Sequence, residues 1–551
     1  MSESNKPQKY LIRVPLEEKF GEPQKGRMKV GSQILRHLSK GIYSSPEMAI
    51  KELISNAFDA DATEVEIDTK SSPGNIAIRD NGIGMDYVDF DQKFTYISKS
   101  IKKGEDEKTE ILHRPMIGRL GIGFIAVSEL CDTMIISSAK RGSNTWFVAT
   151  LDFSKFRDKM YEDADFNDIS EFTLINYPKK NTDESYTHIE LRNLTEPFKN
   201  TLLNIPEQNT KIRNVKKLSF REIVKQIWHT KDHVSIEKEY GPYWRFVMNL
   251  ASISPVQYFE DGPIRKLDNP EIIEPIKKQV KELEFKVTID GMELRKPYLF
   301  PTINKLHDGN FTVLEFSDAV EASNGKTVSY SGYMYSQDGG ILVHDWRGLI
   351  VRVKNTSIGI INPDFLGYPY EGDSLYYKWT FGEIYIKKGL EEAMNIDRAT
   401  FKTADPEYYS FIQSIHEKLR SEVFNSVQTR WRKRNQAKRD ELDNIKMKWR
   451  KNSARKTFNK EFEIITKQSF ETKPVSIDLH KRILELNPIN EVLLQFPPKE
   501  RKFLVEILIA VTIARERYPA NPKKQDDLLL ELLEDLGKKY PKPTGRVKKE
   551  T

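Results

Sequence analysis

Three side chains that carry oxygen atoms, Glu52, Asn56 and Asp59, fall on one stripe of a predicted helix. At 100° per residue, residues 49–59 divide into an apolar half and a polar half, and the polar half also holds Lys51. Such a stripe offers a carboxylate for proton transfer and further oxygens for binding polar groups. An ordinary amphipathic surface helix with a solvated face has the same pattern. The choice between the two therefore depends on what the neighbouring segments could build.

A second group of candidate residues follows the predicted strand 75–79, in the segment Asp80-Asn81-Gly82-Ile83-Gly84-Met85. Two glycines one residue apart allow a close backbone approach that side chains would block. Asp80 just before them could accept a hydrogen bond from an exocyclic amine such as that of adenine. An ordinary Asn-Gly turn is the alternative interpretation of this segment.

A third segment, Gly118-Arg119-Leu120-Gly121-Ile122-Gly123-Phe124, precedes an apolar helix predicted over 124–130. A glycine-rich turn at a helix N-terminus presents free N–H groups and the positive end of the dipole, which suits a phosphate. The segment lacks the context of a dinucleotide-binding fingerprint, and the chain has no P-loop motif.

Regular elements are expected around all three segments. Ser45-Pro46 predicts a helix start with serine as cap and proline in the first turn. Residues 63–69 and 75–79 alternate as two strands of a hairpin, and 133–138 predicts a further strand. The connection 91–116, which contains Lys99, is long for a compact domain and is typical of a lid or of disorder.

Taken together and in this order, ELISNAFDADA, DNGIGM and GRLGIGF resemble the GHKL ATPase superfamily, within about residues 28–200. The strongest likeness is to the ninety-kilodalton heat-shock chaperone family and the MORC ATPases, and SKS at 98–100 resembles the chaperone's segment after the second motif. The resemblance implies a Bergerat-fold sandwich in which ATP lies between helices and a mostly antiparallel sheet. The fold class is therefore α/β (α+β) and multidomain.

The resemblance also implies a role for each matching residue. Glu52 becomes the general base that polarises the attacking water, and Asn56 becomes the ligand of Mg²⁺. The remaining matches surround the nucleotide. Asp80 becomes the adenine anchor, with Gly82, Gly84 and Met85 beside it and Thr187 as its partner through water. Asp59 matches a position near the adenine pocket, where it either supports the structure or contacts the base. Lys99 is assigned to nucleotide binding, and the phosphate-facing lid hinge is formed by Gly118, Gly121, Gly123 and Phe124.

Beyond residue 200 the chain first looks helical and linking (FREIVKQIWHT), and from about 244 to 409 short alternating runs indicate a second α+β domain. We assign LEFKVTID, TVLEFSD, TVSYSGYMYS, GILVHDWRGLIVRVKN and GEIYIKKG to its strands. ATPases of the resembled type reach the phosphates with a cation from this domain. Arg398, in a segment that resembles the chaperone's Asn-[Ile/Val]-Ser-Arg, is our candidate, with Lys354 and Arg347 as alternatives.

The C-terminal third is predicted to be helical. Residues 430–460 contain thirteen Lys or Arg against three acids, a local net of +10 that exceeds the +6 of the whole chain. This segment either binds nucleic-acid phosphates or an acidic partner, or forms a solvated helix. Apolar helices are expected at 483–494 and 503–513, with an acidic one at 526–536. The expected parts are an arm (1–27), the ATP-binding domain (28–215), the α+β middle or transducer domain (216–410), a basic helical segment (411–475), and a C-terminal helical bundle and tail (476–551).

Composition excludes several classes of protein. The only cysteine, Cys131, excludes an internal disulfide and a cysteine-cluster metal site, and it fits a reducing cytoplasm. The longest apolar run, 507–514, is too short to span a membrane. The nine histidines lack the spacing of a metal site.

We expect a cytoplasmic ATPase that closes as a homodimeric clamp on ATP. Three hypotheses remain for what it acts on. It could remodel protein clients like a chaperone, or engage DNA like a MORC or mismatch-repair ATPase in bacterial defence or genome maintenance. It could also be an ATP-gated module that hydrolyses weakly and signals to a partner effector.

Overall fold

The structure is a computed structural model of the 551-residue chain. The residues it describes are 20–27, 45–72, 74–94, 108–118, 127–154, 171–203, 218–230, 233–263, 267–270, 272, 274, 276, 285–299, 311–337, 339–353, 356–395, 399–433, 436–437, 440, 463–466, 475–478, 483–487 and 498–539.

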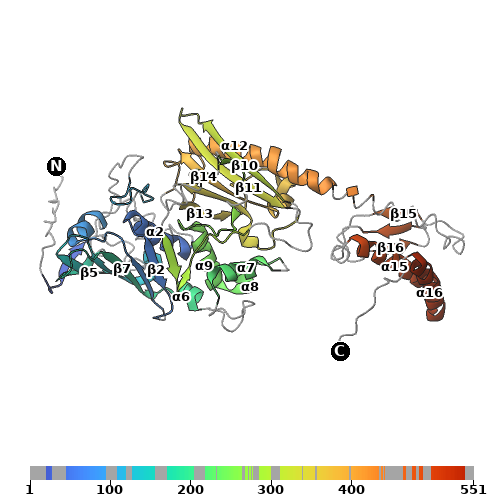
Figure 1. Ribbon diagram of the computed structural model, residues 1–551, viewed down its shortest axis with the longest axis horizontal. Coiled ribbons are helices and arrows are strands. Elements are labelled where there is room, and N and C mark those ends of the chain that lie inside the picture. Colours follow the sequence, from blue (N-terminus) through green and yellow to red (C-terminus); the bar gives the residue numbers. More distant parts are fainter. Residues whose placement is uncertain are drawn as a thin grey trace, which may run out of the picture. The chain divides into compact units, whose positions relative to one another are not determined.

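A nine-stranded sheet organises the N-terminal half (Figure 1). Its order is β1-β6-β5-β4-β7-β3-β2-β8-β9, and its pairs are antiparallel except for β2 with β8. The strands are β1 (Gln24–Arg27), β2 (Glu64–Asp68), β3 (Ile76–Asp80), β4 (Cys131–Ala139), β5 (Thr145–Asp152), β6 (Glu171–Pro178), β7 (Tyr186–Leu194), β8 (Lys286–Ile289) and β9 (Met292–Glu293). Inward residues of these strands form one core with the apolar side of helix α2 (Pro46–Asp59). The predicted hairpin is confirmed as β2–β3, and the predicted strand 133–138 lies within β4.

Helix α2 begins where the sequence indicates, with Ser45 as N-cap and Pro46 in the first turn. The Ser45 side chain makes no capping hydrogen bond, so proline and the buried apolar face define this start. The later helices of this half are α3 (Tyr87–Asp89), α6 (Glu196–Leu203), α7 (Phe220–Trp228), α8 (Ile236–Tyr240) and α9 (Pro242–Ile253). Helix α7 confirms the predicted helical segment, and Ser219 and Glu222 close a capping box at its start. Helix α9 packs against both α2 and the second sheet.

Strand β8 corrects one prediction about the second domain. The run LEFKVTID was assigned there, but β8 pairs in parallel with β2 and extends the first sheet. Its inward residues Val287 and Ile289 are fully buried in the core that α2 and β2 share. Local alternation identified a strand correctly, but it carries no information about which sheet the strand joins.

The second sheet has five strands in the order β10-β11-β14-β12-β13. They are β10 (Phe311–Glu321), β11 (Thr327–Gln337), β12 (Gly348–Val353), β13 (Thr356–Asn362) and β14 (Thr380–Lys388). Four of them confirm predicted strands, whereas β13 was not predicted as a separate one. The strands are joined by three short helices, η6 (His344–Trp346), η7 (Glu371–Asp373) and α11 (Ser374–Tyr377). They are followed by α12 (Pro406–Lys418) and η8 (Leu419–Phe424). One further short helix, η1 (Phe90–Phe94), belongs to the N-terminal half.

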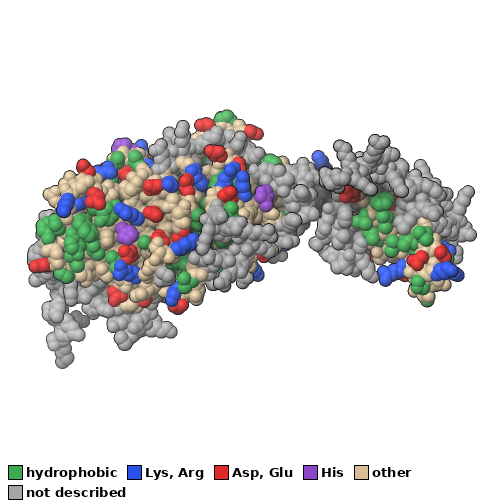
Figure 2. All heavy atoms as spheres, turned by 60° about the horizontal axis from the view of Figure 1, so that its bottom comes forward, with side chains coloured by type: hydrophobic (Ala, Val, Ile, Leu, Met, Phe, Trp, Pro, Cys, Tyr) green, Lys and Arg blue, Asp and Glu red, His purple; other side chains and the backbone are tan. Residues whose placement is uncertain are grey.

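The chain divides into two compact units, and both sheets described so far belong to the first, within residues 1–304 and 309–424. On the face in Figure 2, the basic and acidic side chains of this unit are interspersed. The described face therefore has no extended field of one sign.

The second unit, mainly residues 425–551, corrects the prediction of an all-helical C-terminal bundle. It contains a three-stranded sheet, β15-β17-β16, built from β15 (Glu463–Thr466), β16 (Val475–Asp478) and β17 (Ile483–Leu486). The predicted helix at 483–494 is wrong for 483–486, because this apolar run pairs on both sides. The other two predictions are confirmed by α15 (Pro498–Arg517) and α16 (Pro522–Lys539). Of the basic segment 430–460, most lies outside the described residues. Among the described helices, none combines the length and apolar character that crossing a membrane requires.

Candidate functional site

The polar half of α2 is largely buried. Lys51, Glu52 and Ser55 are 0%, 5% and 1% exposed, whereas Asn56, one turn after Glu52, is exposed. Ser55 satisfies its hydroxyl by donating to the Lys51 carbonyl of its own helix. The Oε1 atom of Glu52 is buried and has no hydrogen-bond partner among the described residues. A buried acceptor of this kind is costly unless a ligand or water satisfies it, so the solvated-surface interpretation of α2 is wrong.

Asp80 ends β3, which lies between β7 and β2 in the nine-stranded sheet, and is opposite Thr187 of β7. Its carboxylate accepts a hydrogen bond from the Gly82 N–H at 2.9 Å. Burial raises the pKa of Asp80 to about 6, although backbone hydrogen bonds from Gly82 and Thr187 lower it. An ionised carboxylate that remains poorly solvated is well suited to accept a hydrogen bond from a ligand amine.

The glycine segment after Asp80 is required by the backbone itself. A Cβ at Gly82 would lie 2.6 Å from the Ala60 carbonyl, and one at Gly84 would lie 1.9 Å from the Ala139 carbonyl. Gly84 also has a φ of +68°, so both space and conformation demand glycine. The Met85 N–H donates to Ser138 at 2.9 Å. These contacts fix the segment against the end of β4, beside Asp80.

Ser138 is a residue that sequence reasoning missed. Its hydroxyl bonds to the Tyr186 carbonyl at 2.9 Å and lies 3.2 Å from the Thr187 hydroxyl. It therefore joins the segment at Met85 to the residue opposite Asp80. No motif marks this serine, because its role follows from the pairing of β4 with β7.

Asp59, at the end of α2, anchors the segment that leads into the predicted lid. Its two carboxylate oxygens accept the N–H groups of Ile117, at 2.7 Å, and of Gly118, at 2.5 Å. A Cβ at Gly118 would lie 2.6 Å from the same carboxylate, so a larger residue would force the Asp59 side chain to shift. The described contacts give Asp59 a positioning role, which the sequence analysis could not separate from contact with a base.

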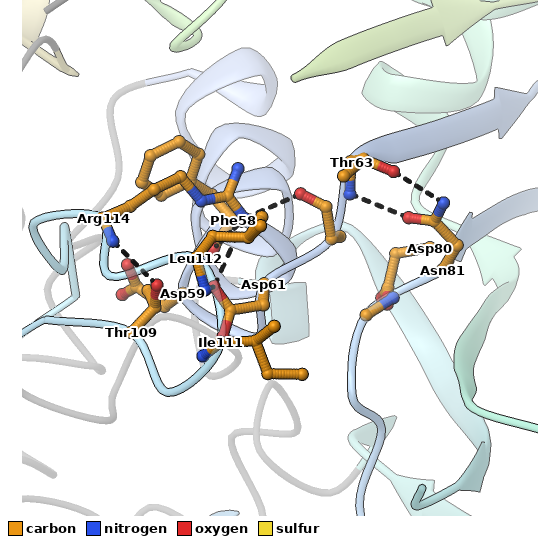
Figure 3. A network of polar contacts seen from close by, with 12 residues as sticks. Phe58, Asp59, Asp61, Thr63, Asp80, Asn81, Thr109, Ile111, Leu112 and Arg114 are labelled. Atoms are coloured by element: carbon orange, nitrogen blue, oxygen red, sulfur yellow. Dashed lines mark hydrogen bonds and ion pairs between the residues drawn. The ribbon is translucent and has the colours of Figure 1, made fainter. Parts of the chain in front are cut away.

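A network at the C-terminal end of α2, missed by sequence reasoning, holds the described part of the same loop (Figure 3). Arg114 donates to the Phe58 and Ala62 carbonyls at 3.0 and 2.8 Å, and its guanidinium stacks on the Phe58 ring. Asp61 accepts the N–H groups of Ile111 and Leu112 at 2.7 and 3.1 Å. Burial would raise the pKa of Asp61, but these hydrogen bonds, one from Thr109 and the charge of Arg114 together lower it. Asp61, the acid shortly after α2, was the only sequence signal for this network. The spacing of the residues does not indicate Arg114.

The second sheet reaches α2 through Lys51. Its Nζ donates to the Ser357 carbonyl of β13 at 2.9 Å and lies 3.8 Å from Glu52 Oε1. Farther along β13, a Cβ at Gly359 would lie 2.4 Å from the Ala399 carbonyl. Strand β13 thus approaches both Lys51 and Ala399.

Two described residues flank the proposed cation Arg398. The Asn395 N–H donates to the Thr400 carbonyl at 2.9 Å, and the side chains of these two residues are also hydrogen-bonded. Arg398 itself lies outside the described residues, together with the candidates Lys354, Lys99, Gly121, Gly123 and Phe124.

The alternative candidate Arg347 is engaged elsewhere. Its guanidinium donates to the Ile341 carbonyl and contacts His233 at 2.9 Å. Arg347 precedes β12, whereas Ser357 pairs with Arg352 near the other end of that strand. At about 3.3 Å per residue, the stretch from Arg347 to Arg352 spans roughly 16 Å, which favours a structural role for Arg347.

No group of three His, Cys, Asp or Glu side chains in the described part of the chain could hold a metal ion. Asn56 could contribute one oxygen from α2. Mg²⁺ commonly takes one or two protein oxygens and completes its shell with phosphate oxygens and water, so the site fits Mg²⁺ only together with a nucleotide.

Comparison with known proteins adds the following. Residues 43–217 match the family described as "Histidine kinase-, DNA gyrase B-, and HSP90-like ATPase". A "Putative type II restriction enzyme HgiDII" from Herpetosiphon aurantiacus is 40% identical over 114 residues, which cover 21% of this chain and 18% of that protein.

Two relatives bear the name "Chaperone protein HtpG". The protein from Vesicomyosocius okutanii is 25% identical over 267 residues, covering 43% of this chain and 41% of the relative. The protein from Rickettsia bellii is 27% identical over 202 residues, covering 32% and 31%. The chain thus spans less than half the length of each of these relatives, and the similarity concerns a part of each protein.

Proposed function

We propose that the chain binds ATP with Mg²⁺ and hydrolyses it. The proposal starts from residues 43–217, which match the histidine kinase-, DNA gyrase B- and HSP90-like ATPases. The observation that carries this proposal is Glu52, a buried carboxylate with one oxygen that has no hydrogen-bond partner among the described residues. Family members are ATPases, and this oxygen is suited to orient an attacking water. The resemblance recognised in the sequence agrees with the family match.

The other residues of the site take roles that follow from their positions. Asp80 holds the adenine amine, with Thr187 opposite it, and Gly82, Gly84 and Met85 form the adjoining backbone. Asn56 binds Mg²⁺, which offsets the phosphate charge. Asp59 holds the start of the lid at Gly118. Lys99, Gly121, Gly123 and Phe124 complete the phosphate side of the pocket in this proposal.

Arg398, in the part of the chain that contains the second sheet, completes the site in this proposal. The contact of Ala399 with Gly359 on β13, and of Ser357 on the same strand with Lys51, supports Arg398 over Arg347. Lys354, two residues before β13, remains the alternative. A guanidinium suits the γ-phosphate because it stays charged and can donate to two oxygens.

The chain works in this proposal as a homodimeric, nucleotide-gated clamp in the cytoplasm that acts on a macromolecule. The chaperone name of the HtpG relatives favours a protein client. The name of the restriction-enzyme relative and the net charge of +10 at residues 430–460 favour DNA in a defence or maintenance role. A weakly hydrolysing module that signals to an effector is the third alternative.

The test of the ATPase proposal is Glu52→Ala in the full chain. We expect turnover to fall by about 100- to 10,000-fold, because a general base contributes that much, while ATP affinity stays near that of the wild type. Phosphate release and binding of a fluorescent ATP analogue measure the two quantities. Wild-type turnover in this variant would overturn the assignment of Glu52.

The choice of macromolecule requires a separate experiment. If DNA is engaged, duplex DNA should stimulate ATP turnover, less so at high than at low salt, since binding releases counterions. Neutralising the lysines and arginines of residues 430–460 should abolish the stimulation while leaving basal turnover intact. Absence of DNA binding at low salt would remove the DNA alternative and leave the protein client and the effector.

A further inference from the structure

Lys51 combines complete burial with contacts on two functional elements. It is 0% exposed, its Nζ donates to the Ser357 carbonyl at 2.9 Å, and the same Nζ lies 3.8 Å from Glu52 Oε1. An ammonium group removed from water costs several kcal/mol unless charge and hydrogen bonds compensate it. A long apolar side chain would avoid that cost, so the charge itself calls for an explanation.

The distance between Lys51 and Glu52 is informative. At 3.8 Å the ammonium compensates the carboxylate charge, but it is too far away to donate a hydrogen bond to Oε1. Glu52 Oε1 therefore keeps its lone pairs available for a water molecule. A direct lysine–glutamate hydrogen bond would occupy the acceptor that a general base needs.

The Ser357 carbonyl maintains this separation. It accepts the hydrogen bond that Nζ would otherwise give to a carboxylate, and it belongs to β13 of the second sheet. The Ser357 side chain in turn donates to the Gly359 carbonyl at 2.5 Å, which stiffens the strand at this contact. The position of Lys51 thus depends on a strand outside the nine-stranded sheet.

We propose that Lys51 is a positioning residue that orients Glu52 for catalysis and makes this orientation dependent on the docking of β13. The proposal rests on the ATPase function proposed above. When β13 is in place, Lys51 is held at a distance that leaves Glu52 oriented, with Oε1 free of a lysine hydrogen bond. When β13 moves away, Lys51 loses its carbonyl partner and Glu52 loses its fixed orientation.

The test compares Lys51→Met with Lys51→Arg in the full chain. We expect Lys51→Met to lower kcat by about 10- to 100-fold with little change in ATP affinity, because misplacing a catalytic group has effects of this size. Lys51→Arg, which keeps the charge and the donor, should recover much of the rate. Lys286→Met, which removes an exposed lysine paired with Glu64, is the matched control and should keep wild-type kcat.

Two further measurements separate positioning from a merely structural role. In a Glu52→Gln background, Lys51→Met should cause no further loss of the residual rate, since both changes act through one group. Hydrogen exchange of the β13 amides should become faster in Lys51→Met. If Lys51→Met does not fold, Lys51→Gln, which removes the charge but keeps a polar head group, replaces it and should likewise lower kcat.

Failure of this inference can be told apart from failure of the proposed function. If the wild type neither binds nor hydrolyses ATP, the ATPase proposal fails, and hydrogen exchange at β13 alone judges the contact. If the wild type is active and Lys51→Met retains its kcat, only the role of Lys51 is overturned. A further rate loss in the Glu52→Gln background would likewise overturn it.

Discussion

Two buried glutamates, Glu383 in the second sheet and Glu52 in α2, use their carboxylates in opposite ways. Glu383 is fully buried on β14, and each of its oxygens is hydrogen-bonded: Oε1 to Arg352, and Oε2 to Tyr258 and Tyr333. Glu52 is almost as buried, yet its Oε1 has no hydrogen-bond partner among the described residues. Burial alone therefore does not distinguish a structural acid from a functional one; the number of satisfied oxygens does.

The electrostatic surroundings of the two acids differ in the same sense. Burial would raise the pKa of Glu383, but the adjoining Arg352 and Lys296 and the two tyrosine hydroxyls together lower it. Arg352 also donates to the Ser252 carbonyl of α9, so the ion pair fastens that helix to the sheet. Lys51, in contrast, stays 3.8 Å from Glu52. The first arrangement fixes a core, and the second leaves an acceptor open.

The largest expected effect compares Glu383→Gln with Glu52→Gln. Glu383→Gln removes one partner of a buried ion pair and should lower the free energy of unfolding by about 3–5 kcal/mol, because Arg352 is left uncompensated. Glu52→Gln should change stability much less, since Oε1 makes no hydrogen bond in the described structure. Calorimetric unfolding of both variants measures the difference. Equal losses would contradict the distinction between the two carboxylates.

The sequence was sufficient for the site elements that short-range patterns encode. Helix α2, the β2–β3 hairpin and the approach at Gly82 and Gly84 follow from periodicity, turn chemistry and the absence of a Cβ. The burial of Glu52 did not follow, because it depends on what packs against the polar half of the helix. The three motifs in their order indicated a nucleotide site, which the pattern of the helix alone could not do.

What the sequence could not supply are the contacts between distant segments. The hydrogen bond from Lys51 to Ser357 joins residues 306 positions apart, and the parallel pairing of β2 with β8 is similarly remote. Residues 483–486 show the same dependence on distant contacts. A short apolar run is compatible with a helix or a strand, and here pairing with neighbouring strands determines that it is a strand. Arg114 has no spacing signal, since its partners are backbone carbonyls.

The next prediction extends the comparison to Asp80, a buried acid with a raised pKa. Its pKa of about 6 exceeds the ordinary 3.8, so the folded state binds the proton more tightly than the unfolded state. The resulting stability is complete below about pH 4 and is lost as the pH rises to about 6. Asp80→Asn should therefore raise the free energy of unfolding at pH 8 by on the order of 3 kcal/mol, while abolishing ATP binding.

Asp68 provides the matched control for Asp80. Burial would raise the pKa of Asp68, but hydrogen bonds from Ser71 and Lys70 and the charge of Lys70 lower it. Asp68→Asn should thus reduce stability and leave ATP binding intact. Calorimetry and ATP-analogue binding across pH 4–8 check both variants. A destabilised Asp80→Asn protein at pH 8 would contradict the cost assigned to the Asp80 charge.

The smallest effect concerns Arg114, which is polar and buried like Glu383 but holds a loop beside the site. Arg114→Leu removes the donors to the Phe58 and Ala62 carbonyls and should cost about 1–3 kcal/mol. The loosening should be local, so the amides of Ile111 and Gly118 should exchange faster and ATP affinity should fall a few-fold. Arg192→Leu, which breaks only an exposed pair with Glu190, is the control and should change neither quantity. Unchanged exchange at Ile111 and Gly118 in Arg114→Leu would mean that Asp59 and Asp61 hold the loop without it, and Asp61→Asn would then be the change that releases the loop.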